Sequence, residues 1–192
     1  KREIICGYGE ILKHSLISDK KFFLFLDKNA SNILSLKSPF IEKSIYQSCL
    51  IKRHVVQIDE NEKNLRKILN FGHTFAHAYE ASLGYSKKLN HGEAVILGIA
   101  SAIKFSLKNN LIAKIDYEMI NNHLNKYNLP RELNKFFSKS YLNKIVSFMQ
   151  KDKKNHTNKI NLVLLTKIGK PYFSLNFDNK KLLKFIKDEL IN

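Results

Sequence analysis

Three of the chain's seven histidines fall within one stretch, FGHTFAHAYEASLGYSKKLNHGEAV, residues 71–95. His73 and His77 are four residues apart, a separation that places two side chains on one face of a helix. Two imidazoles in this arrangement can bind one Zn²⁺, which accepts nitrogen, sulfur or carboxylate ligands. His91 follows a break at Gly84 and could return to the same site if a tight connection joins two packed helices. The spacing alone therefore suggests a metal site with all three histidines. The alternative is a coincidence, with two of them satisfied by backbone carbonyls.

The residues between the first two histidines argue against one well-known zinc chemistry. Thr74, Phe75 and Ala76 stand there, so the glutamate that acts as general base in HExxH metalloproteases is missing. The chain also contains no GxGxxG segment and no P-loop, and it has only 7 glycines. It therefore shows no dinucleotide- or phosphate-binding turn of its own.

Composition indicates a soluble globular protein. The 192 residues are 44% hydrophobic and 26% charged, and this length is sufficient to bury a core. No apolar segment has membrane-spanning length, and the first residues do not resemble a signal peptide. The two cysteines do not form a CxxC pair, so neither a disulfide framework nor a cysteine zinc site is indicated. We expect a cytoplasmic protein.

The formal net charge of +16 suggests nucleic acid as a partner at first sight. The lysines are scattered along the whole chain, however, and the longest clusters, such as KDKK at 151–154, are short. A positive field of this kind would also attract an anionic small molecule. We therefore expect no nucleic-acid partner, and a basic nucleic-acid-binding module remains the alternative from a different functional class.

Helical periodicity dominates the rest of the sequence. One segment, 159–177, alternates like a β-hairpin around Gly169. Ser38 and Pro39 should cap and open the third helix, and Pro130 should open a short one. The prediction is a mainly α fold with one small hairpin near residues 160–175 and no internal domain boundary. The predicted helices cover residues 3–17, 20–29, 38–59, 61–84, 91–110, 116–128, 140–150 and 179–192.

The predicted helix at 91–110 is unusually apolar and carries small residues at Ala94, Gly98, Ala100, Ser101 and Ala102. Such a helix is usually buried, with neighbouring helices close to its backbone. We therefore expect a buried helix here.

Three segments together resemble the 3-dehydroquinate synthases. KRHVVQIDENEKNLRKILNFGHTFAHAYEASLGYSKKLNHGEAVILGIASA is similar to that family's central block, in which a lysine, DE.E.glR, LNFGHT.GHA.E and HGEAV follow in this order. GYGEILKHSLISDKKFF resembles an earlier family segment, and MQKDKKNHTNKINLVLLTKIGKP resembles a later one. The resemblance runs from about residue 6 to 172. It implies that residues 1–192 correspond to the family's C-terminal helical domain, and that its N-terminal NAD-binding α/β domain is absent from this chain.

The resemblance divides the three histidines. The family holds its metal with one glutamate and two histidines, which match Glu10, His73 and His91. His77 then belongs to the substrate site as a catalytic or phosphate-contacting group. One carboxylate and two imidazoles leave coordination positions open, as a catalytic Zn²⁺, Co²⁺ or similar divalent ion requires.

The resemblance also implies a substrate, 3-deoxy-D-arabino-heptulosonate 7-phosphate, which carries a carboxylate and a phosphate. Cationic contacts to it match Lys52 and Arg66, and the guanidinium suits a planar carboxylate. Further matching positions are Asn70 and His77 near the phosphate and reacting carbons, the acidic residues Asp59 and Glu62, one of Lys153 and Lys154, and Lys13 as a candidate for cofactor contact.

The implied activity is that of a phosphorus–oxygen lyase in the shikimate pathway to aromatic amino acids. NAD⁺ transiently oxidises a substrate carbinol, phosphate is eliminated, the ketone is reduced again, and an intramolecular aldol closure gives 3-dehydroquinate. The full-length protein is expected to be a homodimer.

Two features depart from the family pattern. Ala76 stands where a glycine is usual, so a helix packed there would lie slightly further away. Without the nucleotide-binding domain, we expect the isolated chain to be inactive and to hold zinc weakly. The nearest rival interpretation is another sugar phosphate cyclase of the 2-deoxy-scyllo-inosose or valiolone type. Its substrate, the phosphate of a neutral sugar, would not need both Lys52 and Arg66.

Overall fold

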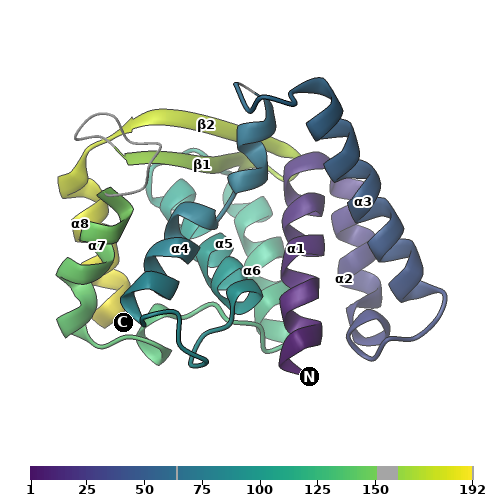
Figure 1. Ribbon diagram of the computed structural model, residues 1–192, viewed down its shortest axis with the longest axis horizontal. Coiled ribbons are helices and arrows are strands. Elements are labelled where there is room, and N and C mark those ends of the chain that lie inside the picture. The colour runs from purple at the N-terminus through teal and green to yellow at the C-terminus, as the bar shows by residue number, and fades with distance from the viewer. Residues whose placement is uncertain (64, 151–159, 192) are drawn as a thin grey trace.

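The computed structural model describes residues 1–63, 65–150 and 160–191 (Figure 1). Within these ranges the chain forms α-helices, three short 3-10 turns and one two-stranded sheet, as the mainly α prediction requires. The helices are α1 (Arg2–Ser18), α2 (Lys20–Leu34), α3 (Phe40–Ile58), α4 (His73–Ser82), α5 (His91–Lys108), α6 (Lys114–Lys126), α7 (Leu142–Gln150) and α8 (Asn179–Ile191), the 3-10 turns are η1 (Leu65–Asn70), η2 (Leu133–Lys135) and η3 (Lys139–Tyr141), and the strands are β1 (Ile160–Lys167) and β2 (Lys170–Phe177).

Helix α5 is the centre of the core. Its residues from Gly92 to Ile103 are all buried, and both α1 and α4 pack against it. The antiparallel hairpin β1–β2 lies across one end of the helices, with α1, α2 and α3 on one side and α7 and α8 on the other (Figure 1). The expectation of a buried apolar helix at this position is confirmed. No helix within the described ranges is both long enough and apolar enough to cross a membrane.

Glycines let neighbouring helices approach the backbone of α5 closely. A Cβ atom on Gly92 would overlap the backbone of Cys6 in α1, and one on Gly98 would overlap the carbonyl oxygen of Gly72 and lie 3.0 Å from the amide nitrogen of Ala76. Ala76 is itself fully buried. Ala76, which stands where the family pattern has glycine, is therefore buried with its backbone close to Gly98 of α5.

The single helix predicted over 61–84 is wrong. The segment forms η1, then a break at Phe71 and Gly72, and then α4. Gly72 has a φ of +79°, the left-handed region in which only glycine is unstrained, and its backbone lies against Ile99 of α5. The helical pattern of apolar residues runs through this position without a break, but packing against α5 imposes a turn at Gly72.

Two predicted helix starts also differ from the structure. Helix α3 begins at Phe40 with Pro39 at the N-cap and no side-chain cap, so Ser38 does not cap it. The element expected at Pro130 is the 3-10 turn η2, which begins three residues later at Leu133. The hairpin prediction is confirmed, with Gly169 at a φ of +81° in its turn and Val163 paired with Phe173.

Candidate metal and substrate site

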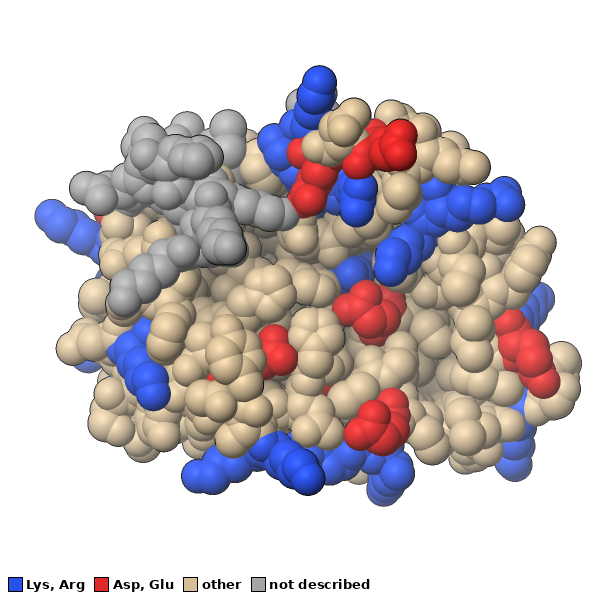
Figure 2. Space-filling view, viewed as in Figure 1, with Lys and Arg blue, Asp and Glu red and all other residues tan. Residues whose placement is uncertain are grey.

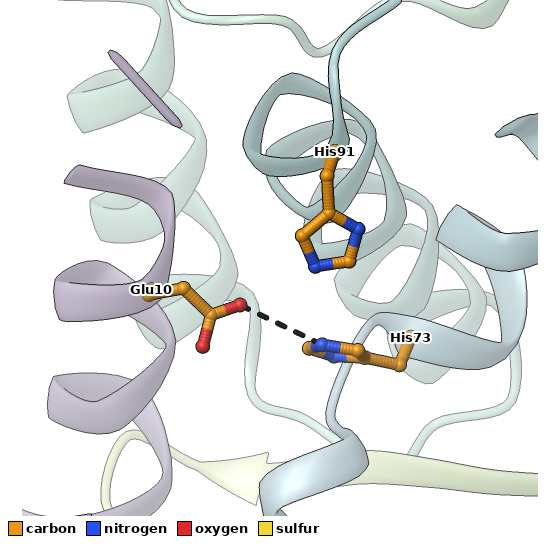
Figure 3. Close-up of side chains that lie close together, drawn as sticks. All are labelled: Glu10, His73 and His91. Carbon is orange, nitrogen blue, oxygen red and sulfur yellow. Dashed lines mark ion pairs between the residues drawn. The ribbon is translucent and has the colours of Figure 1, made fainter. Parts of the chain in front are cut away.

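Three helices bring one carboxylate and two imidazoles together (Figure 3). Glu10 lies in the middle of α1, His73 is the first residue of α4, and His91 is the first residue of α5. One ligand atom from each residue can be chosen so that all three lie within 4.8 Å of one another. This is the separation expected of atoms that share one metal ion.

Close backbone contacts hold these helices in place. Glu93 fixes the start of α5, since its carboxylate accepts a hydrogen bond from the Asn90 amide at 2.9 Å and one from Arg2 Nε of α1 at 2.8 Å. Gly92 meets Cys6 on α1, and Gly98 meets the turn that precedes His73. The glycine and glutamate of the HGEAV segment therefore position its histidine beside α1.

The Glu10 carboxylate has one satisfied and one unsatisfied oxygen. Oε2 accepts a hydrogen bond from Lys13 Nζ at 2.8 Å. Oε1 is buried, has no hydrogen-bond partner within residues 1–63, 65–150 and 160–191, and lies 3.5 Å from His73 Nε2. Burial by itself raises the pKa of Glu10, but the positive charge and hydrogen bond of Lys13 outweigh it, so the pKa is lowered and the group is ionised at neutral pH. A buried carboxylate oxygen without a partner is a position that a cation would satisfy.

His73 is held in its neutral form, as a histidine ligand of a metal would have to be. Burial, followed by the nearby charge of Lys13, lowers its pKa to about 4. Nδ1 lies 3.3 Å from the Phe71 carbonyl oxygen. Donation from Nδ1–H to that carbonyl leaves the Nε2 lone pair facing Glu10.

His91 is oriented by a second carboxylate. Its Nδ1 lies 3.1 Å from Glu80 Oε2, and this hydrogen bond raises the pKa of His91 against the opposing effect of burial. Donation from Nδ1–H to Glu80 leaves the lone pair of the neutral ring on Nε2, the nitrogen that could then bind a metal. A carboxylate behind a histidine ligand is the arrangement found in many metal sites, where it fixes the tautomer and orients the ring. Together with the unsatisfied Glu10 oxygen, the donor set fits a divalent ion such as Zn²⁺ with open coordination positions.

His77 lies beside this group. Its ring centroid is 5.4 Å from that of His73 and 6.3 Å from that of His91, and its side chain is exposed. All three histidines are thus neighbours, as their spacing suggested. The group within reach of one metal ion, however, contains Glu10 in place of His77.

A cavity of about 260 Å³ opens next to the metal-binding group. Four of the residues that the sequence assigned to the substrate line it, two of them cationic. The lining consists of Glu10, Lys13, His14, Lys52, Glu62, Arg66, Leu69, Asn70, His73 and His91.

The segment after α3 shapes one wall of this cavity. The Asp59 carboxylate accepts hydrogen bonds from the backbone amides of Lys63 and Arg66, both at 2.9 Å. Asp59 therefore holds the backbone that carries Arg66. Asn70 Nδ2 donates to Glu62 Oε1 at 2.9 Å, so Glu62 orients an amide at the cavity.

The remaining predicted positions have different outcomes. Lys13 lies in the cavity wall and pairs with Glu10, and its role toward a cofactor stays a prediction. Lys153 and Lys154 lie outside the described residues.

Sequence reasoning missed His14 and Glu80. The helical spacing could have identified both, because it places each on the same helix face as a predicted metal ligand. His14 is one turn after Glu10, and Glu80 is two turns after His73.

The sequence is similar to known proteins over most of its length. Residues 7–155 match the family model described as 3-dehydroquinate synthase C-terminal. The 3-dehydroquinate synthase of Pelagibacter ubique is 63% identical over 190 residues, which cover 99% of this chain and 52% of that protein. That of Thermoanaerobacter pseudethanolicus is 39% identical over 170 residues, which cover 88% of this chain and 46% of that protein. The chain thus spans about half the length of the curated relatives it matches.

Solved structures show the same fold. The 2-epi-5-epi-valiolone synthase from Streptomyces hygroscopicus, with NAD⁺ and Zn²⁺ bound, superposes with a TM-score of 0.83 at 18% identity and covers 98% of this chain and 51% of that one. A 2-deoxy-scyllo-inosose synthase complexed with carbaglucose-6-phosphate, NAD⁺ and Co²⁺ gives a TM-score of 0.81 at 23% identity, with 97% and 52% covered. From the family match and the identity to curated relatives, the chain belongs to the 3-dehydroquinate synthase C-terminal family.

Proposed function

We propose that this chain is the metal- and substrate-binding half of a 3-dehydroquinate synthase, which converts 3-deoxy-D-arabino-heptulosonate 7-phosphate to 3-dehydroquinate and phosphate. The observation that carries the proposal is the meeting of Glu10, His73 and His91 at a cavity that Lys52 and Arg66 also line. The 63% identity to the Pelagibacter ubique synthase supports the same assignment.

Each group has a chemical task in this proposal. A divalent metal held by Glu10, His73 and His91 would act as a Lewis acid toward a substrate oxygen. Lys52 and Arg66 bind the anionic ends of the substrate, and the guanidinium can make two parallel hydrogen bonds to a carboxylate. Asn70, Glu62 and His77 contact substrate hydroxyls and the phosphate region.

The cofactor, partners and location belong to the proposal as well. The two structural neighbours bind NAD⁺ with Zn²⁺ or Co²⁺, which supports NAD⁺ and a divalent metal here. NAD⁺ would be bound mainly by a nucleotide-binding domain beyond these 192 residues. The active protein would be a cytoplasmic homodimer. On the face shown in Figure 2, Lys and Arg side chains lie mainly around the edge, interrupted by acidic ones, which favours a small anionic substrate over nucleic acid.

A chimera tests the proposed activity. The matched half of the Pelagibacter ubique synthase is replaced by this chain, and turnover of the heptulosonate phosphate is followed with NAD⁺ and Zn²⁺ present. We expect turnover by the chimera and none by the 192 residues alone. The matched controls are Glu10→Gln, which removes a metal ligand, and Glu118→Gln on the exposed surface of α6. A folded chimera that binds metal but turns over no substrate would refute the proposal.

The same chimera distinguishes the proposed activity from that of the rival sugar phosphate cyclases. A sugar phosphate without a carboxylate is offered beside the heptulosonate phosphate at matched concentrations. Because Lys52 and Arg66 both line the cavity, we expect selection for the substrate with two anionic groups. Preference for the substrate without a carboxylate would instead place the chain with the inosose or valiolone synthases.

A further inference from the structure

His14 is a buried histidine at the cavity with one ring nitrogen unaccounted for. It lies on α1 one turn after Glu10, lines the cavity, and is only 4% exposed. Its Nδ1 is 2.7 Å from Ser48 Oγ of α3, a hydroxyl that is also buried. Its Nε2 is buried and has no hydrogen-bond partner among the described residues. Such a group in a folded protein calls for an explanation, because leaving it unsatisfied costs about 1–3 kcal/mol.

The hydrogen bond between His14 Nδ1 and Ser48 can run in either direction, and its direction decides which ring nitrogen carries the hydrogen. Nδ1 of His14 is the acceptor available to the Ser48 hydroxyl within the described part of the chain. If Ser48 donates to Nδ1, then Nε2 of the neutral ring carries the hydrogen. A protonated ring would carry a hydrogen on Nε2 as well. In both cases the nitrogen without a partner is a donor.

The surroundings of this donor suit a negatively charged oxygen. Lys13, Lys52 and Arg66 line the same cavity as His14. Burial, and after it the positive charges of Lys13 and Lys52, lowers the pKa of His14 to about 4. Lys52 is one helical turn beyond Ser48 on α3, so the residue that holds the ring and the cation that faces the cavity share one side of that helix.

We propose that His14, held by Ser48, is a further substrate-binding residue that donates a hydrogen bond from Nε2 to an anionic oxygen of the ligand in this cavity. The inference rests on the proposed function in that the ligand is taken to be a phosphorylated sugar acid. The donor acts together with Lys52 and Arg66. The two cations attract the anionic ligand, and the hydrogen bond from His14 orients one of its oxygens.

Two substitutions separate this role from a structural one. In His14→Asn the side-chain amide can still meet Ser48 near the Nδ1 position, but nothing replaces Nε2. In His14→Gln the longer side chain can place an amide N–H near the Nε2 position. The probe is inorganic phosphate, titrated into the chain by calorimetry at low salt. We expect affinity to fall about tenfold in His14→Asn and less than threefold in His14→Gln, since a hydrogen bond to a charged group is lost only in the first.

A direct spectroscopic readout accompanies the titration. The imidazole ¹⁵N resonances of His14 should show a protonated Nε2, and that resonance should shift on adding phosphate. His54→Asn is the matched control, because His54 is exposed on α3 and should bind phosphate like the unchanged chain. Equal phosphate affinity in His14→Asn and the unchanged protein, or a protonated Nδ1 with a bare Nε2, would overturn the inference.

The outcome can be distinguished from failure of the proposed function. Phosphate binding is measured on the chain itself and does not require turnover. In the chimera, His14→Asn should raise KM for the heptulosonate phosphate about tenfold with a smaller change in kcat. If the chimera is active and His14→Asn leaves its KM for the heptulosonate phosphate unchanged, this inference alone is rejected. An inactive chimera in which phosphate binding still depends on Nε2 would reject the synthase assignment alone.

Discussion

Glu10 Oε1 and His73 Nε2 face each other at 3.5 Å, although α1 and α4 are distant in the sequence. Glu10 Oε1 is buried without a hydrogen-bond partner in the described part of the chain, and His91 contributes the third candidate ligand atom of the group. The arrangement is that of ligands around one ion, and it makes metal binding the first property to test.

Replacing Glu10 by Gln should weaken Zn²⁺ binding by roughly a hundredfold or more, because the only carboxylate of the ligand set becomes a neutral amide. Competition with a chromogenic chelator measures the affinity. Glu118→Gln should bind Zn²⁺ like the unchanged chain, since Glu118 lies on the exposed surface of α6. Equal affinity in the Glu10 variant would show that this residue is not a ligand.

Glu80→Gln should weaken Zn²⁺ binding by about tenfold while the fold remains intact. Glu80 accepts the hydrogen bond from His91 Nδ1 and so orients a ligand without touching the metal. The same chelator competition, together with circular dichroism, distinguishes this effect from unfolding. A loss as large as that of Glu10→Gln would mean that Glu80 itself coordinates the ion.

Gly92→Ala should destabilise the chain by about 2 kcal/mol or more, because the new Cβ would overlap the backbone of Cys6 and push α1 away from α5. Gly7→Ala is the matched control on α1. Apart from its own helix, no described residue has an atom within 4 Å of the added Cβ, so alanine should stabilise the helix by roughly 0.5–1 kcal/mol. Urea unfolding of both variants measures the difference, and a neutral Gly92→Ala would argue against the close contact.

Acid should destabilise the metal-free chain below about pH 6.5. Burial, with a further contribution from Lys13, lowers the pKa of both His14 and His73 to about 4, whereas the unfolded chain has ordinary histidine values near 6.5. As the pH falls between these values, the unfolded state takes up protons that the folded state does not. The contribution of the two neutral histidines to the free energy of unfolding is therefore complete above the histidine pKa of the unfolded chain, and it is lost as the pH falls toward 4.

Linkage predicts a loss of about 2 kcal/mol per histidine between roughly pH 7.5 and 5. Urea midpoints at the two pH values, measured with EDTA, give the quantity directly. His14→Asn should reduce the pH dependence by about half the histidine contribution. An unchanged pH dependence in that variant would show that His14 is not the buried neutral group described here.

Asp59→Ala should impair substrate binding without affecting the metal. The Asp59 carboxylate holds the amides of Lys63 and Arg66, so its loss frees the segment that presents Arg66 to the cavity. In the chimera we expect KM to rise several-fold, which corresponds to about 1 kcal/mol, with Zn²⁺ affinity unchanged. Glu60→Gln is the exposed control. An unchanged KM in Asp59→Ala would show that Asp59 only stabilises the loop and does not affect substrate binding.

The sequence by itself determined much of this protein. Apolar periodicity predicted most helices, the alternation around Gly169 predicted the hairpin, and the small residues of the HGEAV helix predicted that this helix is buried. These features depend on local patterns, which a chain carries regardless of its tertiary contacts. The motif resemblance also named Glu10, His73 and His91 as one set, although spacing alone grouped the three histidines.

Only the tertiary structure decided where the patterns stop and which groups meet. The periodicity over 61–84 could not reveal the turn at Gly72, because its left-handed backbone is selected by packing against α5. Glu80 behind His91 and Ser48 behind His14 likewise come from other helices. Hydrogen bonds between distant segments depend on how helices pack, and this packing places a ligand, its orienting carboxylate and the cations of the cavity in one site.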